Sequence, residues 1–228
     1  MLKENGYLEL KNFDRETHSV PSVTEIEKGV WFAAAVGHSN AIFIEGDESV
    51  ILIDPLDTLE RGQKLRCIIE EKCHKPVRTI IYTHGHPDHR GGAGAFKDEV
   101  REIIAFKPVQ APLFGMERLG AVFGLRARRQ VGYGLSDEEA VSQGLGPREG
   151  SNYGEHPAIL PPTLLYDEAI VHRNIDGIEL ELIAVPGETD DQAAVWLPDK
   201  KVLCCGDDYY GCFPNLYAIR GGQYRDIA

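Results

Sequence analysis

Short apolar runs separated by turn residues dominate the first half of the chain and predict strands. The runs are rich in β-branched and aromatic residues, which favour half-buried pleated backbone, and Gly, Asn, Asp or Ser stands between several of them. The predicted strands are Val30–Ala34, Ala41–Glu45, Val50–Asp54, Val77–Tyr82 and Ile103–Phe106, with a hairpin loop at Gly46–Ser49.

Two helices are predicted between these strands. Asp57 or Thr58 can cap a helix that runs to about Lys72, because apolar residues recur there at helical spacing. The segment Gly91–Phe96 is predicted as a short helix whose small residues allow close backbone packing. This alternation of strands and helices predicts an α/β layered architecture.

The pattern changes between residues 107 and 165, which are rich in Gly and Pro and lack a clean apolar periodicity. We interpret this range as a long insertion with one helix near residues 112–130. The insertion either shapes a binding site or forms a solvated surface excursion. Strands are expected again at Ile170–His172, Ile178–Ala184, Ala193–Leu197 and Val202–Cys205.

Composition and charge narrow the classes of protein that the chain can belong to. With 228 residues it can form one sizeable core. The net charge of −12 argues against a nucleic-acid partner, and no apolar run approaches the ~20 residues of a membrane span. The first residues lack the apolar stretch of a signal peptide, so we expect a cytoplasmic protein.

The five cysteines do not form a disulfide framework, because their number is odd and no Cys-x-x-Cys pair occurs. We expect buried or half-buried free thiols. Cys205 and Cys212 lie close to Asp207 in the sequence, which leaves a metal-ligand role open for either of them.

The densest group of metal-binding residue types directly follows the fourth predicted strand. Residues Thr83–His89 read Thr-His-Gly-His-Pro-Asp-His, and imidazole and carboxylate are preferred ligands of zinc and similar metals. The spacing of two residues puts His84 and His86 on one side of the chain, and a turn at the proline aims Asp88 and His89 at a neighbouring point. One loop could therefore serve two metals, and the alternative is a polar turn that is rich in histidine.

Acidic residues at the ends of other strands are candidates for further roles at such a site. The loops Pro186–Asp191 and Gly206–Asp208 each follow a predicted strand. Acidic turns are common, so neither loop is specific alone. Asp54 closes an apolar strand and could orient a ligand histidine, or serve in a turn or cap.

The histidine motif, with Gly91-Gly92 after it and Leu52–Asp54 before it, resembles the metallo-β-lactamase superfamily over roughly residues 23–212. The resemblance implies a four-layer αββα sandwich, here incomplete at its C-terminal end, with one or two metal ions, usually zinc, between the sheet edges. Residues 1–228 would form a metallo-β-lactamase-like catalytic domain that carries the insertion at about 107–165.

Later residues resemble the alkylsulfatase branch of that superfamily. Most members have a histidine after Pro-Gly, whereas this chain has Glu188, as the branch has. Asp207 follows nineteen residues later, where the branch carries a bridging carboxylate. The segment Asn215–Gly222 resembles the branch's Asn-Leu-x-x-x-Arg-Gly sequence, whose arginine contacts the sulfate.

Six residues match the family's metal ligands, and the resemblance implies two zinc ions in an intact site. The six are His84, His86 and Glu188 for one zinc ion, Asp88 and His89 for a second, and Asp207 as the bridge.

The resemblance further implies hydrolysis of alkyl sulfate esters, a small-molecule substrate, by a hydroxide held between the two metals. Asp88 and Asp207 would be the catalytic carboxylates, and Asn215 and Arg220 would bind the substrate. The planar, permanently charged guanidinium of Arg220 suits a tetrahedral oxyanion. Two alternatives stay open. One is a hydrolase of a lactone, thioester or phosphodiester on the same fold, and the other is a catalytically silent metal-binding domain.

Family members also carry a further metal-ligating histidine beyond the bridging carboxylate, a helical dimerisation region and a lipid-carrier-like domain. No matching segment follows in this sequence, which stops at Ala228. We therefore expect an N-terminal fragment of a longer protein, with an incomplete second metal position. A homodimer is expected for the intact protein only.

Overall fold

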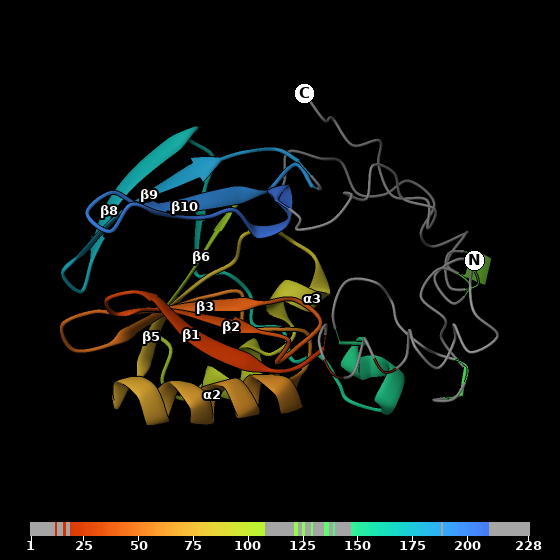
Figure 1. Cartoon of the computed structure of the whole chain (residues 1–228). Coiled ribbons are helices and arrows are strands. Elements are labelled where there is room, and N and C mark those ends of the chain that lie inside the picture. The colour runs from red at the N-terminus through yellow and green to blue at the C-terminus, as the bar shows by residue number, and fades with distance from the viewer. Residues whose placement is uncertain are drawn as a thin grey trace, which may run out of the picture.

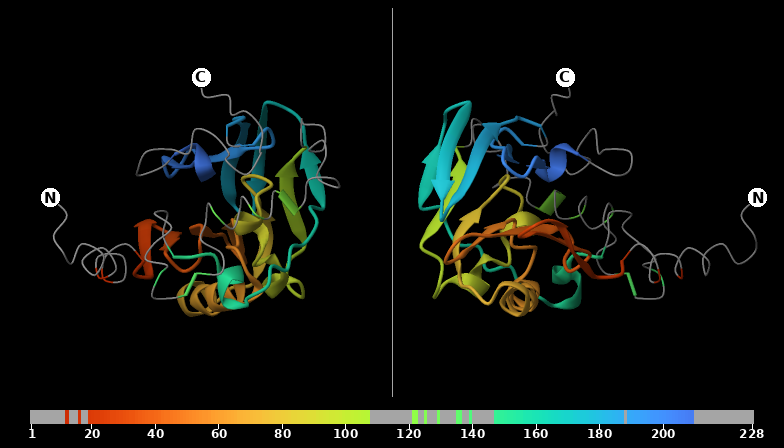
Figure 2. Two further views of the ribbon diagram at one scale, coloured as in Figure 1. Left: turned by 90° about the vertical axis from the view of Figure 1, so that its right-hand side faces the viewer. Right: turned by 60° about the vertical axis from the view of Figure 1, so that its left-hand side comes forward.

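The computed structural model describes residues 19–107, 147–187 and 189–209, with a few isolated positions elsewhere. Within this part, two β-sheets face each other, and one long helix lies against the outer face of the larger sheet (Figure 1). Figure 2 shows the same layers from two further sides. The layered α/β architecture predicted from the sequence is confirmed.

The larger sheet has seven strands in the order β1-β2-β3-β4-β5-β6-β7. Its first four strands pair antiparallel, and β4 to β7 pair parallel. Parallel neighbours need a crossover connection, which a helix supplies between β4 and β5. The strands are β1 (Ser22–Glu27), β2 (Val30–Ala34), β3 (Ala41–Glu45), β4 (Val50–Ile53), β5 (Val77–Ile81), β6 (Glu102–Phe106) and β7 (Leu164–Tyr166).

The smaller sheet is antiparallel, in the order β11-β10-β9-β8. Asp176 and Gly177 form the turn between its first two strands, and both have positive φ angles, of 51° and 81°. A tight turn of that kind matches the twist of the strands it joins. The strands are β8 (Ile170–Ile175), β9 (Ile178–Ala184), β10 (Ala193–Leu197) and β11 (Val202–Cys204).

The crossover helix is α2 (Leu59–Cys73), and Thr58 rather than Asp57 caps it by accepting the backbone N–H of Arg61. The other helical elements are short: α3 (Pro87–Arg90), η2 (Ala93–Phe96), η3 (Gly150–Tyr153) and η4 (Gly206–Asp208). A Cβ atom on Gly62 of α2 would lie 2.3 Å from the carbonyl oxygen of Gly92. The predicted close backbone packing after the histidine motif is therefore present. Within the described residues, no helix is both long and apolar enough to cross a bilayer.

Alternation along the strands of the larger sheet produces two separate cores. One face, with Phe43, Leu52 and Ile80, packs against α2 and η2. The opposite face, with Ile51 and Ile81, packs against the smaller sheet. Because β4 is buried on both faces, its sequence Val50–Ile53 is a continuous apolar run rather than an alternating one.

Several details of the predicted elements differ from the structure: β8 continues to Ile175, β11 ends at Cys204, and the short helix expected at Gly91–Phe96 is confined to η2, Ala93–Phe96. The strands expected to end at Asp54 and Tyr82 end one residue earlier, and Asp54 has a positive φ of 55° that takes it out of β4. Strand β7 begins inside the range interpreted as an insertion, extends one residue beyond it and pairs with β6. The helix expected near residues 112–130 falls almost wholly outside the described residues.

Candidate metal centre

The histidine motif and Asp54 meet because two neighbouring strands are parallel. Strands β4 and β5 end at the same edge of the sheet, so Asp54 and the loop Thr83–His89 leave it side by side. The backbone N–H of Ala193 donates to the Thr83 carbonyl at 2.8 Å, which ties this loop to the smaller sheet. Helix η4, directly after β11, brings Asp207 to the same place.

His84, His86 and Asp207 form a group that could hold a metal ion. Each offers one ligand atom, and these atoms lie within 4.8 Å of one another. The Nε2 atom of His84 lies 3.0 Å from Nδ1 of His86. Two nitrogens bound to one tetrahedral zinc at ~2.0–2.1 Å would be ~3.3 Å apart, so this donor pair fits a shared metal.

Burial keeps His84 in the form that binds metals. Its side chain is buried, and burial, followed by the neighbouring imidazoles of His89 and His86, lowers the pKa of His84 to about 2. A metal-binding imidazole must be neutral, so His84 offers a lone pair without first losing a proton.

His89 connects this group to Asp88. Its Nε2 atom lies 3.2 Å from Oδ1 of Asp207 and 3.5 Å from Oδ2 of Asp88. Asp207 thus contacts His89 and also belongs to the group with His84 and His86. The structure brings together five of the six predicted metal ligands.

The carboxylates around His89 raise the pKa of its imidazole. Burial alone would lower the pKa of His89, but Asp54, Asp88 and Asp207 outweigh burial and raise it well above its ordinary value. Three carboxylates around one buried imidazole form a strongly anionic site, which a bound cation would neutralise.

Asp54 contacts both ends of the histidine loop Thr83–His89. Its carboxylate accepts the backbone N–H of Thr83 at 2.8 Å and the hydroxyl of Thr83 at 2.7 Å, and it lies 2.8 Å from Nδ1 of His89. Of the two roles left open by the sequence, the contact with His89 favours orientation of a ligand histidine.

The adjacent carboxylate Asp208 contacts a different loop. A Cβ atom on Gly187 would lie 1.9 Å from Oδ1 of Asp208, so the loop before Glu188 packs directly on that side chain. Burial and then the charge of Asp207 raise the pKa of Asp208 to about 6. The two neighbours therefore differ, and only Asp207 joins the histidine group.

Three predicted site residues lie outside the described residues. They are the ligand Glu188 and the substrate-binding residues Asn215 and Arg220. Their roles stay predictions.

Two residues that contact the loop were missed from the sequence. The hydroxyl of Ser39 donates to the carbonyl oxygen of Asp88 at 2.6 Å, and the guanidinium of Arg90 donates to the carbonyl oxygen of Gly85, between the two ligand histidines. A serine in a turn carries no local signal of such a contact. Arg90, next to the motif, could have been suspected.

Cys205 and the remaining histidines do not join the described metal group. Burial, followed by the charge of Asp208, raises the pKa of the Cys205 thiol, so it is protonated rather than a ready ligand. Cys212 lies outside the described residues. His156 and His172 are exposed, and His74 ends α2 in a left-handed conformation.

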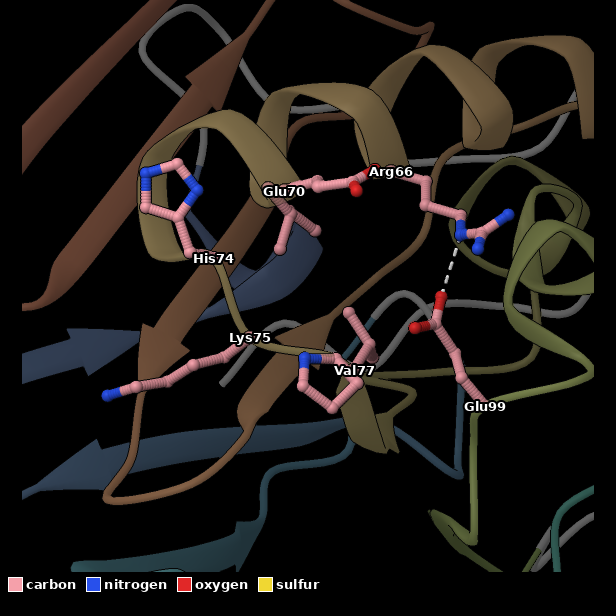
Figure 3. A pocket seen from close by; sticks show the side chains of 8 residues that line it. Arg66, Glu70, His74, Lys75, Val77 and Glu99 are labelled. Atoms are coloured by element: carbon pink, nitrogen blue, oxygen red, sulfur yellow. Dashed lines mark hydrogen bonds and ion pairs between the residues drawn. The ribbon is translucent and has the colours of Figure 1, made fainter.

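A pocket of about 280 Å³ lies away from this loop (Figure 3). Val77 lines it at the start of β5, whereas the histidine loop follows the other end of that strand. Arg66 and Glu99 form an ion pair across it at 2.8 Å. The pocket is therefore separate from the candidate metal centre. Its lining residues are Arg66, Ile69, Glu70, His74, Lys75, Pro76, Val77 and Glu99.

Comparison with known proteins assigns the fold and the family. The model of the metallo-beta-lactamase superfamily matches residues 34–208, which include the histidine loop and Asp207. The chain belongs to this superfamily, as the sequence motif indicated.

Several curated relatives carry sulfatase names. Alkyl/aryl-sulfatase BDS1 of Saccharomyces cerevisiae is 30% identical over 220 residues, covering 92% of this chain and 34% of that protein. A linear primary-alkylsulfatase of Pseudomonas is 28% identical over 199 residues, covering 80% and 36%. An (R)-specific secondary-alkylsulfatase of Pseudomonas is 26% identical over 222 residues, covering 92% and 33%. The chain spans about a third of the length of these relatives.

Solved structures agree on the fold. The stereoselective inverting sec-alkylsulfatase Pisa1 from Pseudomonas superposes with a TM-score of 0.76 at 23% identity, covering 96% of this chain and 36% of that one. A metallo-beta-lactamase from Pontibacter korlensis gives 0.52 at 20% identity, covering 81% and 70%. The two facing sheets are those of the metallo-β-lactamase fold, and the chain corresponds to about a third of the alkylsulfatase structure.

Proposed function

We propose that the protein is a metal-dependent hydrolase of alkyl sulfate esters. One observation carries the proposal: His84, His86 and Asp207 converge in a chain whose sulfatase relatives are 26–30% identical to it. The buried, anionic surroundings of His89 support a cationic occupant of the same site.

In this proposal His84, His86 and Glu188 hold one metal ion, Asp88 and His89 hold a second, and Asp207 is shared. Zinc, when bound, supplies a Lewis acid that polarises the ester and lowers the pKa of a nearby water. The binding of two ions is part of the proposal.

The chain's own residues would orient the metal ligands and bind the substrate. Asp54 holds the Nδ1 side of His89, so that Nε2 points toward Asp88 and Asp207. Asp88 and Asp207 would accept hydrogen bonds from the attacking water, and one of the two carboxylates would take its proton. Arg220 would pair with the sulfate oxygens through its planar guanidinium, with Asn215 as a second donor.

A substrate panel tests the proposal. The zinc-loaded chain is incubated separately with dodecyl sulfate, dodecyl phosphate, bis(p-nitrophenyl) phosphate, a lactone and a thioester, and the products are quantified. We expect release of inorganic sulfate and much slower turnover of the others. Preferential turnover of the lactone, thioester or phosphodiester would establish the alternative hydrolase. Two bound zinc equivalents with no turnover would favour a silent metal-binding domain.

A further inference from the structure

Ser39 connects the candidate metal centre to a distant part of the chain. Its hydroxyl donates to the carbonyl oxygen of Asp88 at 2.6 Å, across 49 residues of sequence. Ser39 is only 8% exposed, so water competes little for this hydrogen bond. Asp88 belongs to α3, a single turn with too few internal hydrogen bonds to fix its own position.

The loop that carries Ser39 is itself held by Asp57. The backbone N–H of His38 donates to Oδ1 of Asp57 at 3.2 Å. A Cβ atom on Gly37 would lie 2.8 Å from the same oxygen, so the loop lies directly against this carboxylate. Asp57 is 6% exposed and is paired with Arg61 at 3.0 Å.

The same buried ion pair also fixes a segment that returns from far along the chain. Oδ2 of Asp57 accepts the backbone N–H of Gly150 at 2.8 Å, and Arg61 pairs with Glu155 at 2.9 Å. A few residues further on, the N–H of Ala158 donates to the carbonyl oxygen of Gly91 at 2.6 Å, just after α3. The helix α3 and the residue directly after it are therefore contacted by two segments that the same ion pair holds.

We propose that Ser39 is a positioning residue for the metal centre, and that Asp57 and Arg61 hold the loop from which it acts. Without the Ser39 hydroxyl, α3 loses a hydrogen bond that fixes the position of its backbone, and with it the positions of Asp88 and His89, relative to the end of β5. His84 and His86 precede α3 and keep their own contacts with Thr83 and with each other. The effect of Ser39 thus falls on the Asp88 and His89 side of the centre.

The inference rests on the proposed function, because it assumes a metal at this site. Residues that orient metal ligands typically contribute ~10–100-fold to metal affinity when removed. Loss of one buried hydrogen bond, in contrast, costs only ~1 kcal/mol of stability, so the chain is expected to fold without it.

The test compares Ser39→Ala with Ser49→Ala. Ser49 is equally buried, at 8% exposure, and its hydroxyl donates at 2.7 Å to Asp176, at the opposite end of the sheets. Both variants are titrated with Co²⁺ and with Zn²⁺ against a chelator. Circular dichroism and thermal unfolding report the fold.

We expect Ser39→Ala to raise the Kd of one metal equivalent by about 10-fold or more and to change the Co²⁺ absorption spectrum. The Ser49→Ala chain should bind as the wild type does, although it should lose at least as much thermal stability, because the Ser49 hydroxyl donates to a charged carboxylate. Unchanged affinity and spectrum in Ser39→Ala, with wild-type metal uptake intact, would overturn the positioning role alone. No metal uptake by the wild-type chain would overturn the proposed function, and this inference with it.

Discussion

The Nδ1 atom of His89 lies 2.8 Å from Oδ2 of Asp54, although 35 residues separate the two in the sequence. A metal-binding imidazole is neutral, and because a carboxylate can only accept, this contact would then place the remaining proton of His89 on Nδ1. The lone pair then lies on Nε2, which faces Asp88 and Asp207. In the proposed site, Asp54 thus orients His89 so that its Nε2 atom is available to a metal beside Asp88 and Asp207.

Asp54→Asn is therefore expected to weaken metal binding by ~10–100-fold while leaving the size of the side chain unchanged. The amide presents an N–H toward Nδ1 of His89 or toward Thr83, and either choice disrupts the present hydrogen bonds. Metal affinity is measured by competition with a chelator.

Asp176→Asn is a matched control for this change. Asp176 also has a positive φ, of 51°, and also accepts three hydrogen bonds, but at the far end of the sheets from Ser49 and Glu48. Both variants should lose ~1.5–3 kcal/mol of stability, since hydrogen bonds to charged groups are affected. Equal metal affinities in the two variants would contradict the role given to Asp54.

Gly206→Ala is expected to disturb Asp207 as well as to strain the backbone. Gly206 has a φ of +54°, and an added Cβ atom would lie 2.8 Å from the side chain of Thr83. Gly29→Ala is the control, because Gly29 has a φ of +73° and its nearest neighbours would be 3.7 Å away.

Both glycine variants should therefore lose ~1–2 kcal/mol from the left-handed backbone. Only Gly206→Ala should lose more than that and should bind metal more weakly. Thermal unfolding of the two variants compares their losses of stability, and metal titration compares their metal affinities. A Gly206→Ala chain that keeps wild-type metal affinity would show that Asp207 is not held through this contact.

Much of the fold could be predicted because strands such as β2, β3, β9 and β10 are short apolar runs with clear turns at both ends. Strand β7 was missed because three residues are too few for a periodicity. Its pairing partner β6 lies far away in sequence, so only the folded sheet defines it.

In the candidate site, too, residues with a local sequence pattern could be predicted, whereas contacts between distant segments could not. The histidines of the loop are visible in the sequence because they follow one strand within a few positions. Asp54 was a candidate without a known partner, since its contact with His89 depends on the parallel pairing of β4 and β5. Ser39 could not be found at all, because its contact with Asp88 joins two loops and involves a backbone carbonyl.

The cysteines should react with iodoacetamide in a fixed order. Cys67 is exposed, whereas burial, followed by the charge of Glu45, raises the pKa of Cys73 to about 11. Burial, followed by the neighbouring thiol of Cys205, raises the pKa of Cys204 to about 12. Since the thiolate is the reactive form, mass spectrometry at pH 8 should find Cys67 labelled first and Cys73 and Cys204 protected until the chain unfolds.

The raised thiol pKa of Cys73 also gives stability a pH dependence. An unfolded thiol ionises near ~8.5, whereas Cys73 stays protonated in the folded chain up to about 11. The contribution is complete below the unfolded pKa and is lost as pH rises through the window between these values. Urea unfolding from pH 8 to 11 should show a flatter decline for Cys73→Ala than for the wild type. Identical slopes would contradict the assignment.

Removal of the metal should lower the melting temperature of the wild-type chain. A ligand that binds only the folded state stabilises it by ~2.7 kcal/mol at a hundredfold excess over its Kd. Zinc addition after chelation should restore the melting temperature in the wild type and in His172→Ala, whose imidazole is exposed on β8. His84→Ala should show a much smaller zinc-dependent shift. A full shift in His84→Ala would place the bound zinc elsewhere.

The most direct measurement of the central claim is anomalous diffraction at the zinc absorption edge from crystals of the zinc-loaded chain. We expect a strong peak bounded by His84, His86 and Asp207, with any second peak adjoining Asp88 and His89. A zinc peak remote from these side chains, or no peak in crystals whose solution carries stoichiometric zinc, would contradict it.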